Sequence, residues 1–179
     1  MTVQVQGLHH ITLNGADRQT SVDFWEGLLG MRLLFEQPNL DDFKTNHLYF
    51  DTGDGTTITV FTEEGRAVPK NQQRQPVGGL HHIALMVSQA TIRVAAERLT
   101  EAGYENTGIV DRGFMDSLYF RDPLGLLLEL ASYKFDPPQG TTHAQVLAKA
   151  YEIRKARGAD ATETQDVADA LRALAAEAR

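Results

Sequence analysis

Histidine is concentrated at two points of this 179-residue chain, and the two points have nearly the same sequence. Residues 7–13 read GLHHITL and residues 79–85 read GLHHIAL, so these segments hold four of the six histidines. Imidazole nitrogens bind transition metals and carry protons near neutral pH. One doublet alone would suggest half-buried strand residues, whereas a doublet that occurs twice favours a chemical site.

The doublets belong to a longer internal repeat. The segment LYF at residues 48–50 returns at residues 118–120, an offset of 70. In each copy an apolar run precedes a helical segment, and shorter strands ending in TTITVF or LLLELA follow it. We therefore predict two βαβββ modules, residues 7–65 and 79–135. The expected fold class is α+β, in which both modules form one curved mixed sheet around a metal cavity, with helices at the C-terminus.

The helix of each module is predicted from an apolar stripe that a glycine ends. In the first module the stripe is Val22, Trp25, Leu28 and Leu29, before Gly30. In the second module it is Ile92, Ala95, Ala96 and Leu99, before Gly103. Each helix should therefore bury one face against the strands of its own module.

Alternation along the strands places three polar side chains on the face opposite the helices. Ile11 and Leu13 share the face that must cover the helix, so His10 points to the concave side. The same alternation turns His82 inward in the second module and Glu129 inward in the last strand. A carboxylate inside the run LLLELAS would cost several kcal/mol to bury without a partner, so it needs a cation or a strong hydrogen-bond donor, and with two inward histidines a metal is favoured. His10, His82 and Glu129 are therefore the predicted metal ligands.

Two histidines and one carboxylate can hold Fe(II) or a similar divalent ion on one face and leave up to three positions open. The position equivalent to Glu129 in the first module, 70 residues earlier, is Thr59. Threonine is a poor ligand for a transition metal. We therefore expect open coordination positions for a substrate and for O2.

The chain resembles the vicinal oxygen chelate superfamily, in which paired βαβββ modules curl around one metal, over residues 7 to about 135. A ligand set of His, His and Glu is similar to that of extradiol ring-cleaving dioxygenases, which implies Fe(II), or in some cases Mn(II). A closer resemblance is to the hydroquinone 1,2-dioxygenase group, which cleaves para-diols. It rests on the motifs GLHHITL…VDFWEGLLGMRLL…DD…HLYFDTGDG and GLHHIAL…DRGFMDSLYFRDPLGLLLELA. It implies the three ligands that alternation indicates.

The resemblance also implies residues around the metal. Arg112 and Tyr119 match an Arg and a Tyr that lie near the substrate oxygens in that group, although the first could be a surface residue and the second a core aromatic. His81, His9 and Thr12 would support the ligands. Alternation alone turns His9 and His81 away from the cavity, so their placement beside the ligands depends on strand twist.

The function expected from these residues is an extradiol-type ring-cleaving dioxygenase that acts on a catechol or hydroquinone with O2. Three alternatives stay open. A transferase of the fosfomycin-resistance type uses the same ligand types around Mn(II). A glyoxalase-like isomerase, or an epimerase, would want a fourth ligand where Thr59 lies. A drug-binding module of the bleomycin-resistance type would need no metal.

Composition limits the remaining possibilities. With 42% apolar residues the chain can bury one sizeable core, and the absence of cysteine excludes disulfides and thiolate sites. The net charge is −7 with scattered Lys and Arg, so we expect no nucleic-acid partner. The sequence contains no run near the roughly 18 apolar residues of a membrane span. We expect a cytoplasmic protein, and the superfamily resemblance implies a homodimer.

The C-terminal segment reads differently from the modules. Residues 1–136 are predicted to form the metal-binding domain and residues 137–179 a helical extension, with two helices divided at Gly158. These helices could pack outside the sheet or on a partner subunit, or they could form a lid over the metal. Their apolar stripes are Val146, Ala150 and Ile153 in the first, and Val167, Leu171, Leu174 and Ala178 in the second.

Overall fold

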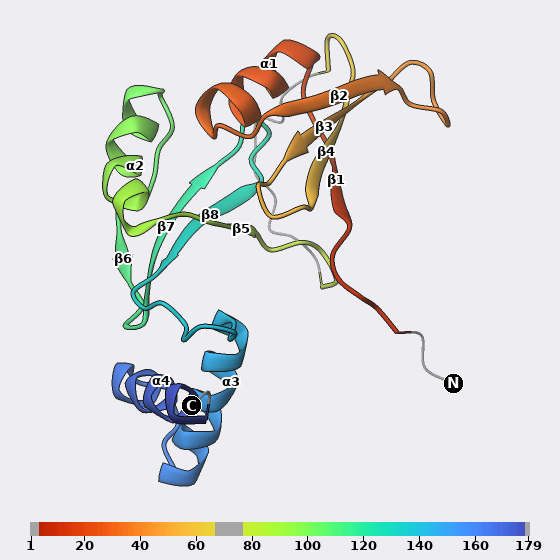
Figure 1. Ribbon diagram of the computed structural model, residues 1–179. Coiled ribbons are helices and arrows are strands. Elements are labelled where there is room, and N and C mark those ends of the chain that lie inside the picture. The colour runs from red at the N-terminus through yellow and green to blue at the C-terminus, as the bar shows by residue number, and fades with distance from the viewer. Residues whose placement is uncertain (1–3, 67–76, 178–179) are drawn as a thin grey trace. The chain divides into compact units, whose positions relative to one another are not determined.

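The computed structural model describes residues 4–66 and 77–177 (Figure 1). They divide into two compact units: the described part of residues 1–82 together with 121–127, and residues 83–120 together with the described part of 128–179. Each unit contains one helix-covered sheet. Among the described helices, none is long and apolar enough to cross a membrane.

The first unit contains the first module. Its sheet has the order β1-β4-β3-β2, in which β1 runs parallel to β4 and the other pairs are antiparallel. A helix and a π-helical segment connect β1 to β2. The elements are β1 (His10–Asn14), α1 (Arg18–Val22), η1 (Asp23–Leu28), β2 (Leu33–Pro38), β3 (Asn46–Asp51) and β4 (Thr57–Thr62).

The second module repeats this topology. Its sheet has the order β5-β8-β7-β6, and β5 runs parallel to β8. The predicted βαβββ repeat and the α+β class are therefore confirmed, but the strands form two four-stranded mixed sheets where one curved sheet was expected, because each module pairs its own strands. The elements are β5 (Ile83–Met86), α2 (Gln89–Glu101), β6 (Val110–Asp111), β7 (Met115–Arg121) and β8 (Leu127–Tyr133).

The first helical segment differs from its prediction. It begins at Asp17, whose carboxylate accepts the Thr20 N–H at 2.9 Å, and it changes to π-helical hydrogen bonding after Val22. Its buried residues are Ser21, Phe24 and Trp25. The predicted stripe is correct at Trp25 and wrong in giving its other members the core positions: the buried residues are spaced i, i+3 and i+4, so the buried face starts one residue earlier than predicted. Val22, Leu28 and Leu29 are only partly buried.

The second helix matches its prediction more closely. Ser88 caps α2 by accepting the Thr91 N–H at 3.0 Å, and the helix ends before Gly103, which has a φ of 85°. This conformation favours glycine. The buried residues of α2 are Ile92, Ala95 and Leu99, which belong to the predicted stripe, whereas Ala96 is only partly buried.

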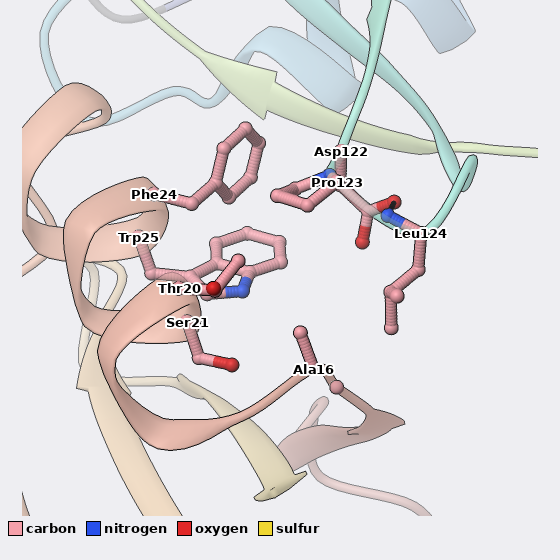
Figure 2. Close-up of a pocket in the computed structure, with 9 residues that line it drawn as sticks. Ala16, Thr20, Ser21, Phe24, Trp25, Asp122, Pro123 and Leu124 are labelled. Atoms are coloured by element: carbon pink, nitrogen blue, oxygen red, sulfur yellow. Dashed lines mark hydrogen bonds between the residues drawn. The ribbon is translucent and has the colours of Figure 1, made fainter. Parts of the chain in front are cut away.

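The turn between β7 and β8 packs against the first helical segment. The Asp122 carboxylate accepts the Leu124 N–H at 2.9 Å and the Leu126 N–H at 2.7 Å, which fixes the turn, and burial raises the pKa of Asp122. Figure 2 shows Pro123 and Leu124 facing Phe24 and its neighbours on α1 and η1. The space left between them is about 10 Å³, room for about one water molecule. This is a packing contact and not a substrate site.

The C-terminal segment forms the two predicted helices, α3 (His143–Arg157) and α4 (Thr164–Glu177), which lie side by side (Figure 1). Gly158 ends α3 with a φ of 73°. The two helices share a small core that also contacts the loop before β7 and the segment after β8, through Phe114 and Phe135. The core consists of Val146, Ala150, Val167 and Ala170, with Ile153, Leu171 and Leu174 partly buried around it. Ala178, which completed a predicted stripe, lies outside the described residues.

An ion pair between the exposed Arg157 and the buried Asp166 fixes the connection between α3 and α4. The Arg157 guanidinium donates to both oxygens of Asp166, at 3.2 and 2.8 Å, and the Glu163 N–H donates to the same carboxylate at 2.7 Å. Asp166 is 2% exposed. These hydrogen bonds, with that from Arg157 the largest cause, lower the pKa of Asp166.

Candidate functional site

The two histidine doublets have the same internal geometry. The Nδ1 atoms of His9 and His10 are 2.7 Å apart, with ring centroids at 5.0 Å and an interplanar angle of 78°. The Nδ1 atoms of His81 and His82 are also 2.7 Å apart, with centroids at 5.0 Å and an angle of 77°. His9 therefore lies against His10, and His81 against His82, which is the supporting placement that the family resemblance implies. His9 and His81 both lie before the strands, where the two-residue alternation does not hold.

This geometry determines which imidazole nitrogen can bind a metal. Two Nδ1 atoms in hydrogen-bond contact share one proton, so one ring donates and the other accepts. A ligand histidine that binds through Nε2 keeps its proton on Nδ1 and donates it to a neighbouring group. His9 can accept that proton from His10, and His81 can accept it from His82. In both doublets Nε2 is then the ligating atom.

The strand position equivalent to Glu129 carries a hydroxyl pair in the first sheet. Thr59 is fully buried, and its Oγ1 donates to the Oγ1 of Thr12 at 2.9 Å. Thr59 pairs with Thr12 in the sheet register, as Glu129 pairs with Ala84 in the second sheet. The register therefore agrees with the repeat in making Thr59 the equivalent of Glu129.

The second unit contains the remaining predicted residues. Glu129 lies in the middle of β8 and is 4% exposed. Arg112 follows β6 in an exposed turn, and its guanidinium carbon lies 5.8 Å from the ring centroid of Tyr119. The structure thus brings Arg112 and Tyr119 together, at a distance typical of a cation–π contact.

The predicted three-ligand site stays a prediction. His10 and His82 belong to the first unit and Glu129 to the second. Over residues 4–66 and 77–177, no three His, Asp or Glu side chains form a group that could hold a metal ion. The chemistry of the donors nevertheless fits a divalent metal, because two imidazoles with engaged Nδ1 atoms and a buried carboxylate supply the N and O ligands that Fe(II) and Mn(II) accept.

A cluster of four rings on the first sheet was not among the predicted site residues. Phe35 stacks on Tyr49 at 4.1 Å, Tyr49 contacts His47 at 4.2 Å, and His47 contacts Phe61 at 4.4 Å between ring centroids. The Tyr49 hydroxyl lies 3.0 Å from His47 Nδ1. Burial, and to a lesser extent the charge of His10, lowers the pKa of His47.

The sequence contains a signal for this cluster. In HLYF, Leu48 and Phe50 are buried toward the helix, and alternation then places His47 and Tyr49 on the face that carries His10. The segment that marks the repeat therefore also carries a polar face, and that face indicates a site.

A groove of about 490 Å³ lies in the second unit, between the ends of β5 and β8 and the starts of α2 and α3. One wall is formed by His143, whose ring stacks on Tyr133 at 4.2 Å with an interplanar angle of 15°. No predicted site residue lines this groove in the described part of the chain. It is therefore separate from the residues on which the functional argument rests.

Comparison with known proteins relates the modules to one superfamily. The family profile described as Glyoxalase/Bleomycin resistance protein/Dioxygenase superfamily matches residues 7–130. A provisionally named ring-cleaving dioxygenase, MhqO of Bacillus subtilis (strain 168), is 32% identical over 133 residues, or 73% of this chain and 41% of that protein. The glutathione transferase FosA of Serratia marcescens is 29% identical over 126 residues, or 70% of this chain and 80% of that protein.

The similarity extends to solved structures. The crystal structure of a dioxygenase, also provisionally named, from Bacillus subtilis matches with a TM-score of 0.60 and 31% identity, over 73% of this chain and 42% of that one. The chain thus spans less than half the length of MhqO. It spans most of the length of FosA.

Proposed function

Because the chain belongs to the glyoxalase/bleomycin resistance protein/dioxygenase superfamily, we propose that it is a ring-cleaving dioxygenase that acts on a catechol or hydroquinone. The observation that carries the proposal is the repeated His doublet with identical Nδ1 contacts. Such duplication of a supported imidazole has a reason in metal binding and none in strand packing. The 32% identity to MhqO supports the reaction class.

His10, His82 and Glu129 would hold Fe(II), or Mn(II). When bound, this ion supplies a Lewis-acidic, redox-active centre with open positions for the diol oxygens and O2. His9 and His81 keep the proton of each ligand ring on Nδ1. The hydroxyl pair of Thr12 and Thr59 keeps a neutral, weakly coordinating surface where a fourth ligand would otherwise lie.

Tyr119 and Arg112 would act on the substrate. The Tyr119 hydroxyl can donate a hydrogen bond to a diol oxygen that has lost its proton, and the guanidinium beside its ring can stabilise the same anion. The reaction breaks one ring C–C bond, and both oxygen atoms of O2 enter the product. The ring is oxidised and O2 is reduced, so no further reductant is needed.

The test is oxygen consumption by anaerobically Fe(II)-loaded protein with catechol and hydroquinone, followed by mass spectrometry of the product formed from isotopically labelled O2. We expect uptake of O2 and a ring-opened product that carries both labelled atoms. Glu129→Gln, which keeps the shape of the side chain, should show neither. Absence of O2 uptake by wild-type protein that contains one metal ion per chain would contradict the proposal.

A second candidate function is a metal-dependent transferase. It is favoured by the match to FosA, of which this chain covers 80%. The test is the formation of a glutathione adduct of fosfomycin by Mn(II)-loaded protein. An adduct without O2 uptake on diols would replace the first proposal by the second.

The proposal includes a homodimer, which the superfamily resemblance implies. Sedimentation equilibrium of the purified chain measures this directly. A mass of one chain at all concentrations, together with full activity, would show that one copy suffices.

A further inference from the structure

The ring cluster of the first sheet lies on the face that carries His10. Tyr49 pairs with Thr59 in the register of β3 and β4. The Thr59 hydroxyl bonds Thr12, which is two residues from His10 on the same face of β1. The opposite face is occupied by Phe50, whose ring contacts Trp25 at 6.4 Å between centroids. Tyr49 therefore faces the side of the sheet on which the proposed chemistry would occur.

His47 has an unusual hydrogen-bond state. Its Nε2 is buried and has no hydrogen-bond partner among the described residues, while its Nδ1 lies 3.0 Å from the Tyr49 hydroxyl. If Nδ1 accepted the hydroxyl proton, the ring proton would sit on Nε2 as a buried N–H donor without an acceptor. Buried N–H groups of that kind are the rarest unsatisfied groups in proteins.

The alternative arrangement leaves a smaller defect. If Nδ1 carries the proton, it donates to the Tyr49 oxygen, and Nε2 is left as an acceptor without a donor. In a doubly protonated ring Nδ1 also carries a proton, so it again donates to the Tyr49 oxygen. In either case the Tyr49 hydroxyl accepts from His47 and keeps its own proton for another acceptor. No acceptor for that proton is found among residues 4–66 and 77–177.

We propose that Tyr49, oriented by His47, donates a hydrogen bond to an oxygen of the bound aromatic diol. This inference rests on the proposed dioxygenase function and adds a substrate-binding residue and a positioning residue to it. The stacking of Tyr49 on Phe35 and the contact with His47 hold the phenol ring in one orientation before substrate arrives. A donor that is already oriented loses little entropy on binding.

The repeat gives this role a structural parallel. Tyr49 is the equivalent of Tyr119, at the offset of 70. Each module thus offers one phenol on the corresponding strand. The two differ in what orients them, because Arg112 lies over the ring of Tyr119 whereas His47 bonds the hydroxyl of Tyr49.

The experiment measures binding of 4-nitrocatechol to metal-loaded protein under argon, from the change in its visible spectrum, beside metal content and kcat/KM for catechol cleavage. Tyr49→Phe keeps the ring stack and removes the hydroxyl. We expect its dissociation constant for 4-nitrocatechol to rise roughly 10- to 100-fold, as for the loss of one hydrogen bond to a charged group. Its metal content should be unchanged. Tyr151→Phe, on the exposed side of α3, is the matched control and should bind as the wild type does.

His47 is tested by removal and by rescue. His47→Phe removes the donor and also removes the unsatisfied nitrogen, so its unfolding stability should not fall while its affinity for 4-nitrocatechol does. His47→Asn should restore most of the affinity, because its amide nitrogen can donate from close to the place of Nδ1. A merely structural role for His47 would not produce this pattern.

The outcomes separate this inference from the function on which it rests. A wild-type protein that neither binds 4-nitrocatechol nor consumes O2 overturns both. A wild type that binds and cleaves diols, with Tyr49→Phe within twofold of it in affinity, overturns the role of Tyr49 and leaves the function standing. If Tyr49→Phe binds 4-nitrocatechol more weakly while His47→Phe binds it as the wild type does, only the positioning role of His47 is overturned.

Discussion

Replacing Thr59 with glutamate tests whether this position faces the metal. Thr59 is fully buried, and its side-chain hydroxyl bonds the hydroxyl of Thr12. A carboxylate left without a partner at such a position destabilises a protein by about 3–5 kcal/mol. Because a typical domain is stable by about 5–15 kcal/mol, the metal-free variant should be close to unfolding. Urea titrations in the presence of a chelator measure this loss.

Metal should restore the variant if the new carboxylate reaches it. A ligand at 1,000 times its dissociation constant stabilises the native state by about 4.1 kcal/mol, which is comparable with the cost of burying the carboxylate. We therefore expect the stability of Thr59→Glu to depend on Mn(II) far more steeply than that of the wild type. At the same time O2 uptake with diols should fall, because an anionic side chain would occupy a coordination position that the substrate needs.

The matched control lies on the same strand. Thr62 is 2% exposed but lies on the other face of β4, which it shares with the core residues Ile58 and Val60. Thr62→Glu should lose a similar amount of stability, and Mn(II) should not restore it. If Mn(II) stabilised both variants equally, or neither, Thr59 would not face a metal and the open-position argument would fail.

Three further predictions follow from the candidate site and the C-terminal helices. Glu129→Gln should lower metal content, measured by plasma emission spectroscopy, with little change in the urea midpoint; unchanged metal content would exclude this ligand. His9→Phe removes the group that accepts from His10 and should weaken metal affinity about 10- to 100-fold, measured by competition with a chromophoric chelator. Asp166 has a lowered pKa, so its contribution to stability is present above the ordinary carboxyl pKa of about 3.9 and is lost as pH falls through the lowered native value. Acid unfolding should therefore be less steep in Asp166→Asn, and identical acid transitions would show that the contact with Arg157 contributes nothing.

Much of the fold could be predicted because the repeat and the apolar alternation are strong local signals. The spacing of Ile92, Ala95 and Leu99 predicts the buried face of α2, and the offset of 70 predicts the equivalence of Thr59 and Glu129 that the sheet registers show. These features depend only on the period of the chain and on which residues are apolar. They can therefore be predicted without knowledge of tertiary contacts.

Other features could not be predicted, and each failure has a local cause. Phe24 is buried and Val22 is not because the first helical segment has apolar residues on two adjacent faces, and a 3.6-residue period fits either face equally well. His9 contacts His10 because it lies before β1, where side chains need not alternate between the two faces of a sheet. The proximity of Arg112 to Tyr119 was implied by resemblance and not by spacing, since a turn separates them. The orientation of Tyr49 depends on the protonation of a neighbouring ring, which no sequence pattern encodes.

The differences between the two modules are as informative as their likeness. The doublets are kept in both copies with the same geometry, so the imidazole positions are duplicated. The strand position that carries Glu129 in one copy carries Thr59 in the other, so the buried carboxylate is not duplicated. The position of His47 is Ser117 in the second copy, where a short hydroxyl cannot reach a tyrosine as an imidazole does. A fully symmetric pair would surround a metal with four protein ligands and leave less room for substrate. In the proposed site, the asymmetric pair would instead provide three ligands, a neutral face at Thr59 and a tyrosine hydroxyl oriented by His47, and that combination would favour binding an oxygen-bearing ring over holding a structural ion.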